Sequence, residues 1–149
     1  MSKIGNEIGS IKLTINSNLE DIHLVGLAVT GICSSTTLTK EEVYEVELCL
    51  VEAMTNAVKH AYKYQPDHEM DTLVALFEDR MVIKVCDEGP GMESFSPPKL
   101  DFNPADRKSL PDGKLGLPIM FYVMDEVSYH KGPEKNVLTM TKLLKENKT

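Results

Sequence analysis

Apolar and polar positions along the chain follow two periods, which together predict its secondary structure. Residues 10–16, SIKLTIN, place an apolar side chain at every second position, as in a half-buried strand. Apolar, β-branched runs predict further strands over residues 72–77, 81–86, 125–130 and 137–144. Helical spacing of apolar residues predicts helices over about residues 19–33, 39–62 and 115–123.

Local signals support the start of each predicted helix. The first two helices are preceded by S/T-x-x-E capping boxes, formed by Ser17 with Glu20 and by Thr39 with Glu42. In the third helix, Pro118 falls in the first turn, where a missing N–H costs little. We therefore expect three separate helices.

The order of elements predicts the fold class. Strands 72–77 and 81–86 are joined by a short polar link, and the last two strands by a turn at Gly132 and Pro133. Such hairpins imply a mixed, mainly antiparallel sheet. We expect an α+β two-layer sandwich with three helices on one face, formed as a single domain over residues 1–149.

Between the second hairpin strand and the third helix lies a long segment without periodicity. Residues 93–112 contain Pro97, Pro98, Pro104 and Pro111 among many polar residues. A loop of this length in a compact domain is usually a functional lid or a disordered segment. We expect a lid over about residues 93–114.

Candidate chemistry begins with two polar residues in the second helix. Residues 48–62, LCLVEAMTNAVKHAY, are apolar almost all the way round, which predicts a buried helix. Glu52 and Asn56 interrupt this pattern four residues apart and so share a face. A carboxylate there should be paired, bind a ligand or line a wet cleft. Either a hydrogen-bonded Glu–Asn pair or a site with a general base and a Mg²⁺ ligand fits.

A second candidate is the turn after strand 81–86, DEGPGM. Asp87 follows a buried strand, and Gly89 and Gly91 flank Pro90. Pro-Gly suits a type II turn with a positive φ at glycine, and glycines let backbone approach a ligand closely. The segment is either a plain surface turn or the place where a carboxylate accepts hydrogen bonds from the amino group of a base.

A third candidate is the glycine pair Gly113 and Gly116, where the lid meets the third helix. A helix N-terminus with glycines favours anions, and Lys114 adds positive charge. The alternative is a hinge with a solvated cation. The Walker A pattern is absent.

Composition narrows the classes of partner. The net charge is -7, without a basic cluster, so direct nucleic-acid binding is not expected. The three cysteines are scattered in apolar runs, which suits buried reduced thiols in a cytoplasmic protein. There is no signal-peptide pattern and no run long enough to span a membrane.

In combination, these motifs resemble the GHKL, or Bergerat-fold, ATPases over nearly the whole chain. Within that superfamily the sequence is similar to small bacterial anti-sigma factors that are serine protein kinases. The similarity lies in EAMTNAVKHAY (52–62), VCDEGPGM (86–92) and LGLPIMFYVMDEV (115–127). It implies a protein that binds ATP and Mg²⁺, sequesters a sigma factor and phosphorylates a small STAS-like anti-anti-sigma protein. A homodimer would also fit.

The resemblance also implies roles for individual residues. Glu52 would be the catalytic base, Asn56 would coordinate Mg²⁺, and Asp87 would bind the amino group of adenine. The remaining expected nucleotide contacts are Lys59, His60, Gly89, Gly91, Met92, Gly113, Lys114, Gly116 and Leu117.

Two departures from the family pattern open alternatives. Lys114 stands two residues before Gly116, where the family has glycine, and residues 136–139 lack the usual Gly-Thr, so Thr139 receives no role. One alternative is a nucleotide-binding regulator that acts by sequestration without catalysis. Another is a detached ATPase domain of a histidine kinase. The sequence does not identify the sigma factor, the anti-anti-sigma protein or the inducing signal.

Overall fold

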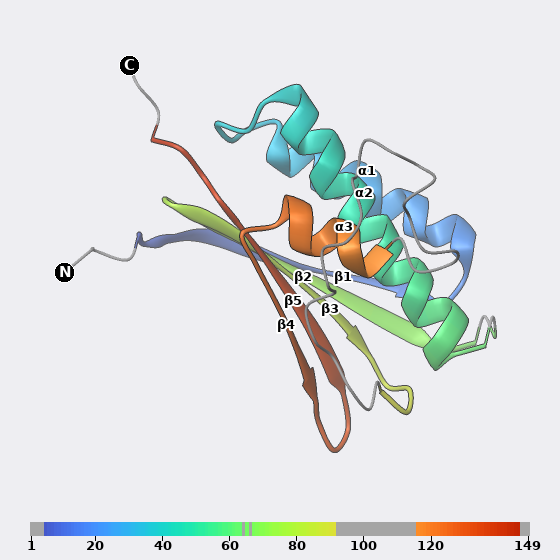
Figure 1. Ribbon diagram of the computed structural model, residues 1–149. Helices are drawn as coiled ribbons and strands as arrows, with labels where there is room; N and C mark the ends of the chain where they lie inside the picture. The colour runs from blue at the N-terminus through green and yellow to red at the C-terminus, as the bar shows by residue number, and fades with distance from the viewer. Residues whose placement is uncertain (1–4, 64, 66, 92–115, 147–149) are drawn as a thin grey trace.

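The computed structural model describes residues 5–63, 65, 67–91 and 116–146, which form a five-stranded sheet with helices on one face (Figure 1). The elements are β1 (Glu7–Asn16), α1 (Leu19–Cys33), α2 (Lys40–Asn56), the π-helix η1 (Ala57–Ala61), β2 (Glu69–Phe77), β3 (Arg80–Asp87), α3 (Gly116–Val123), β4 (Glu126–Lys131) and β5 (Asn136–Leu143). The predicted lid, with Gly113 and Lys114, and the predicted nucleotide contact Met92 lie outside the described residues.

The sheet has the order β1-β2-β3-β5-β4, and every described strand pair is antiparallel. The expectation of a mixed sheet is thus corrected to a fully antiparallel one, while the α+β sandwich is confirmed. Because β5 lies between β3 and β4, it joins the final hairpin to the rest of the sheet. No helix within the described ranges is long and apolar enough to cross a membrane.

The two predicted capping boxes differ in outcome. Thr39 forms the predicted box, with its side chain accepting from the backbone of Glu42 and the Glu42 carboxylate accepting from the backbone of Thr39. At α1 the cap is Asn18, which accepts from the N–H of Asp21. Ser17 is instead fully buried, and its hydroxyl donates to the carbonyl of Gln65 and accepts from the backbone of His68. Ser17 therefore ties the end of β1 to the loop before β2.

The core lies between the helices and one face of the sheet. Alternate strand residues, such as Met70, Ile83 and Met140, are fully buried there, as period-two packing requires. From α2, Leu50 and Met54 pack into the same layer. Six buried methionines of the described residues lie in the core, and their flexible side chains suit an irregular interface between helix and sheet. They are Met54, Met70, Met81, Met120, Met124 and Met140.

Helix α2 buries one stripe rather than its whole circumference. Ala53 and Met54 are buried, but Val51, Glu52 and Asn56 are only half-buried. The predicted all-round burial is therefore wrong. Because Glu52 is only half-buried, its charge does not require a buried partner.

The helix changes its winding directly after Asn56. Residues 57–61 form a π-helix turn, in which one extra residue is accommodated. Such bulges are rare and are frequent at functional sites. Here the turn rotates the following residues, leaving Lys59 and His60 exposed, burying Val58 and bringing Ala61 against the turn that follows β3.

Candidate functional site

A pocket opens between the end of α2 with η1 and the inner face of β3, β5 and β4. Most of its lining is apolar, and three polar residues, Asn56, His60 and Asp87, contribute to it. A largely apolar cleft with a few convergent polar groups is the usual form of a small-molecule site. The lining residues are Ala53, Asn56, Ala57, His60, Ala61, Val85, Asp87, Pro90, Gly91, Tyr129 and Leu138.

The carboxylate of Asp87 is held on one side by hydrogen bonds. Its Oδ1 atom accepts from the backbone N–H of Gly89 at 2.9 Å and from Nδ2 of Asn136 at 3.0 Å. The same Asn136 nitrogen donates to the carbonyl oxygen of Gly89 at 2.9 Å. Among the described residues, nothing donates to Oδ2. Asp87 therefore offers one oxygen to a ligand.

The two glycines of the DEGPG turn are required by close packing. A Cβ on Gly89 would lie 2.3 Å from the Cβ of Ala61 in η1. Gly91 has a φ of +79°, which favours glycine, as the Pro-Gly pattern predicted. The turn thus forms a wall of the pocket and is not a plain surface turn.

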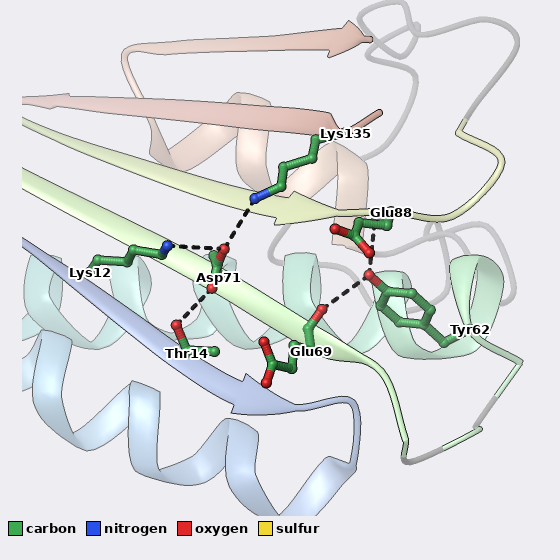
Figure 2. Close-up of polar contacts among 7 residues, drawn as sticks. All are labelled: Lys12, Thr14, Tyr62, Glu69, Asp71, Glu88 and Lys135. Carbon is green, nitrogen blue, oxygen red and sulfur yellow. Dashed lines mark hydrogen bonds and ion pairs between the residues drawn. The ribbon is translucent and has the colours of Figure 1, made fainter. Parts of the chain in front are cut away.

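Tyr62 connects this turn to the end of η1 (Figure 2). Its hydroxyl accepts from the backbone N–H of Glu88 at 2.7 Å and donates to the carbonyl oxygen of Glu69 at 3.3 Å. Its ring stacks on His68 with centroids 4.6 Å apart. Burial raises the pKa of the Tyr62 phenol, so the hydroxyl stays protonated and remains able to donate.

Those predicted site residues that the structure describes divide into three groups. Asn56, His60, Asp87 and Gly91 line the pocket together, and Gly89 packs beside it. Glu52 and Lys59 do not line it: Glu52 is half-buried one turn before Asn56, and Lys59 is exposed. Glu52 and Asn56 form no hydrogen bond with each other, which excludes the interpretation as a satisfied pair. Gly116 and Leu117 begin α3, which packs against α2.

Several functional residues were not predicted from the sequence. Tyr129 and Leu138 line the pocket from β4 and β5, and Asn136 and Tyr62 hold its polar wall. Strand alternation places Leu138 on the inner face and Thr139 on the opposite one, so Thr139 does not line the pocket.

A metal ion would find few protein ligands in the described part of the chain. No cluster of three His, Cys, Asp or Glu side chains there is arranged to hold one. The amide oxygen of Asn56 is a hard donor on the pocket wall. A single protein ligand suits Mg²⁺, which keeps several waters and is usually bound together with substrate phosphates.

Comparisons with known proteins identify the family to which the chain belongs. A sequence model for the histidine kinase-like ATPase domain matches residues 15–142. The chain is 32% identical to the serine-protein kinase RsbW of Bacillus subtilis (strain 168) over 145 residues, covering 93% of this chain and 88% of that protein. It is 29% identical to the serine-protein kinase RsbW of Staphylococcus aureus over 141 residues, covering 91% and 87%.

A solved structure agrees at the level of the fold. The crystal structure of the RsbU and RsbW domains of a Mycobacterium tuberculosis protein matches with a TM-score of 0.64 and 14% identity, covering 92% of this chain and 33% of that longer one. The chain belongs to the histidine kinase-like ATPase family, in the branch of the RsbW serine-protein kinases. The resemblance to GHKL ATPases stated from the sequence motifs is thereby confirmed.

Proposed function

We propose that the protein binds Mg-ATP in this pocket and transfers the γ-phosphoryl group to a serine of a small anti-anti-sigma protein. It would also sequester a sigma factor, and phosphorylation would control which of the two partners is bound. The observation that carries the proposal is the partly satisfied Asp87 carboxylate facing an apolar pocket whose other wall carries Asn56. Relatives named serine-protein kinase support the reaction class.

The pocket suits the adenine end of the nucleotide. A flat apolar base would pack among Ala53, Val85 and Leu138, and Asp87 Oδ2 would accept a hydrogen bond from its amino group. Asn56, on the α2 wall, would bind Mg²⁺, which when bound neutralises charge on the phosphate oxygens. Gly113, Lys114, Gly116 and Leu117 are proposed to contact the phosphates.

Glu52 is proposed as the catalytic base. Its carboxylate lies one helical turn before Asn56 and is half-buried, so a protein substrate can reach it. In phosphoryl transfer most of the catalysis is positioning and charge stabilisation, and a carboxylate accepts the proton of the attacking hydroxyl. Glu52 would take the serine proton as the oxygen attacks the γ-phosphorus.

The experiment measures ATP binding and phosphoryl transfer separately. ATP should bind more tightly with Mg²⁺ than with EDTA, and labelled γ-phosphate should reach a serine of a candidate anti-anti-sigma protein. Glu52→Gln should abolish transfer and keep ATP affinity within about twofold, because the side chain lies outside the pocket lining. Unchanged transfer by this variant would show that Glu52 is not the base.

A regulator that sequesters without catalysis remains the second candidate, because Lys114 replaces a family glycine. This candidate function predicts that the unmodified protein binds nucleotide but transfers no phosphoryl group. The detached histidine-kinase alternative is less favoured, since the relatives matched over nearly their full length are serine-protein kinases. The sigma-factor partner, homodimerisation and a cytoplasmic location stay predictions.

A further inference from the structure

We propose that Asn136 is a specificity-determining positioning residue. In this proposal, which rests on the proposed ATP site, its amide fixes Asp87 so that the free oxygen accepts only from a base with an exocyclic amino group. The pocket would thereby select adenine over a purine with a carbonyl at the same position.

Asn136 and Asp87 face each other at the end of the sheet. Asn136 is the first residue of β5, Asp87 is the last of β3, and the two form a register pair. Asn136 is 2% exposed, so its amide must find its partners within the protein. Its side chain is one of the few buried polar groups in the described part of the chain.

Both protons of the Asn136 amide nitrogen have acceptors. One bond goes to Asp87 Oδ1 at 3.0 Å and the other to the carbonyl oxygen of Gly89 at 2.9 Å. An amide NH₂ group has two protons, so this donor is fully used. The arrangement links the carboxylate to the backbone of its own turn and restricts rotation of the Asp87 side chain.

The consequence for ligand binding concerns the second oxygen. Oδ1 already accepts from Gly89 N–H and from Asn136, which leaves Oδ2 as the oxygen available to a base. An ionised carboxylate accepts and does not donate, so an amino group suits it and a carbonyl oxygen opposes it. If Asn136 were lost, the carboxylate could rotate and the preference would weaken.

A purely structural role for Asn136 makes a different prediction. An amide that only secured the strand end would change the stability of the fold and the affinity for all nucleotides by a common factor. An amide that orients Asp87 would change the ratio between nucleotides. The ratio is therefore the decisive measurement.

The experiment compares binding of ATP and of inosine triphosphate, which has a carbonyl in place of the amino group, both with Mg²⁺. Asn136→Leu removes both donors at similar volume, and Asn136→Ser keeps one donor in a smaller side chain in case the leucine variant does not fold. Thr139→Val, on the same strand but the opposite face, is the matched control. Thermal unfolding without nucleotide shows whether each variant is folded.

We expect the unmodified protein and Thr139→Val to prefer ATP. In Asn136→Leu the preference should fall about tenfold, chiefly through lost ATP affinity, with Asn136→Ser intermediate. An unchanged ratio in a folded variant, whether or not both affinities fall, would overturn the role of Asn136 and leave the proposed ATP site standing. Failure of the unmodified protein to bind ATP would overturn both proposals.

Discussion

The phenol oxygen of Tyr62 lies 2.7 Å from the backbone nitrogen of Glu88 and accepts its hydrogen bond (Figure 2). This contact joins the residue after η1 to the turn that carries Asp87. Together with the bond from Asn136 to the carbonyl of Gly89, it holds both sides of the turn. The wall of the pocket is thus fixed by residues from two distant parts of the chain.

Removing the Tyr62 hydroxyl should weaken both the fold and the site. Tyr62→Phe leaves the N–H of Glu88 without its partner, and we expect the free energy of unfolding to fall by about 1 kcal/mol. ATP affinity should fall severalfold as the turn loosens. Urea unfolding and ATP titration measure the two effects. Tyr44→Phe, at an exposed position on α2, is the control and should change neither the free energy of unfolding nor the ATP affinity. If Tyr62→Phe left the ATP affinity unaltered, Tyr62 would not be a residue that positions the turn.

Gly89 should not tolerate a side chain. The added Cβ of Gly89→Ala would meet the Cβ of Ala61 at 2.3 Å and its Cα at 2.7 Å, so η1 and the turn must separate. We expect ATP affinity to fall at least tenfold, as measured by titration calorimetry. Ala61→Gly in the same protein should restore part of the affinity, because it removes the nearer contact but not the backbone one. Equal loss in the single and double variants would show that the contact with Ala61 is not the cause.

Asp71 should stabilise the fold in a pH-dependent manner. Its carboxylate accepts from Thr14 at 2.7 Å and lies near Lys12 and Lys135, on the face of the sheet opposite the helices (Figure 2). Although partial burial acts to raise the pKa of Asp71, the Thr14 hydrogen bond and the two lysines hold it below its ordinary value. A carboxyl whose folded pKa is lowered stabilises above its unfolded pKa and loses that contribution as pH falls through the folded one.

Asp71→Asn should therefore lower the free energy of unfolding by about 1 to 2 kcal/mol at pH 7, and this difference should shrink below about pH 4. Urea unfolding from pH 7 to pH 3 measures it. Asp67→Asn serves as the control, because the Asp67 side chain is 81% exposed and should contribute little. A difference that stayed constant down to pH 3 would contradict the assigned cause.

The three cysteines should be unreactive in the native protein. All are buried and free, and burial raises the pKa of Cys33 to about 11 and that of Cys49 to about 12. Since the thiolate is the reactive form, a thiol reagent at pH 8 should modify them slowly until the protein is unfolded in urea. Cys86, at 7% exposure, should react first. Rapid native-state modification of Cys33 or Cys49 would contradict this burial.

Local patterns predicted the elements well because each is encoded by neighbouring residues. The Thr39 box and the positive φ of Gly91 followed from short motifs, and the grouping of Asn56 with Asp87 followed from the resemblance to the GHKL ATPases. The Ser17 box was wrong because Asn18 competes for the cap and Ser17 finds partners in the loop before β2.

The features that the sequence did not predict depend on contacts between residues that are distant along the chain. The bond from Glu88 to Tyr62 spans 26 residues, and that between Asn136 and Asp87 spans 49. Neither Tyr62 nor Asn136 forms a recognisable motif with its partner. The insertion of β5 between β3 and β4 is likewise set by packing of the whole sheet and not by any single segment.

The position of β5 between β3 and β4 also relates assembly of the sheet to ligand recognition. Strands β1, β2 and β3 form a meander, β4 and β5 form a hairpin, and the strands of the two parts pair along the β3–β5 seam. Asp87 and Asn136 are the terminal pair of that seam. A slip of one residue would place Lys135 or Val137 beside Asp87 and turn the hairpin's core side chains outward. Adenine recognition at this site would therefore report whether the hairpin has docked in its native alignment.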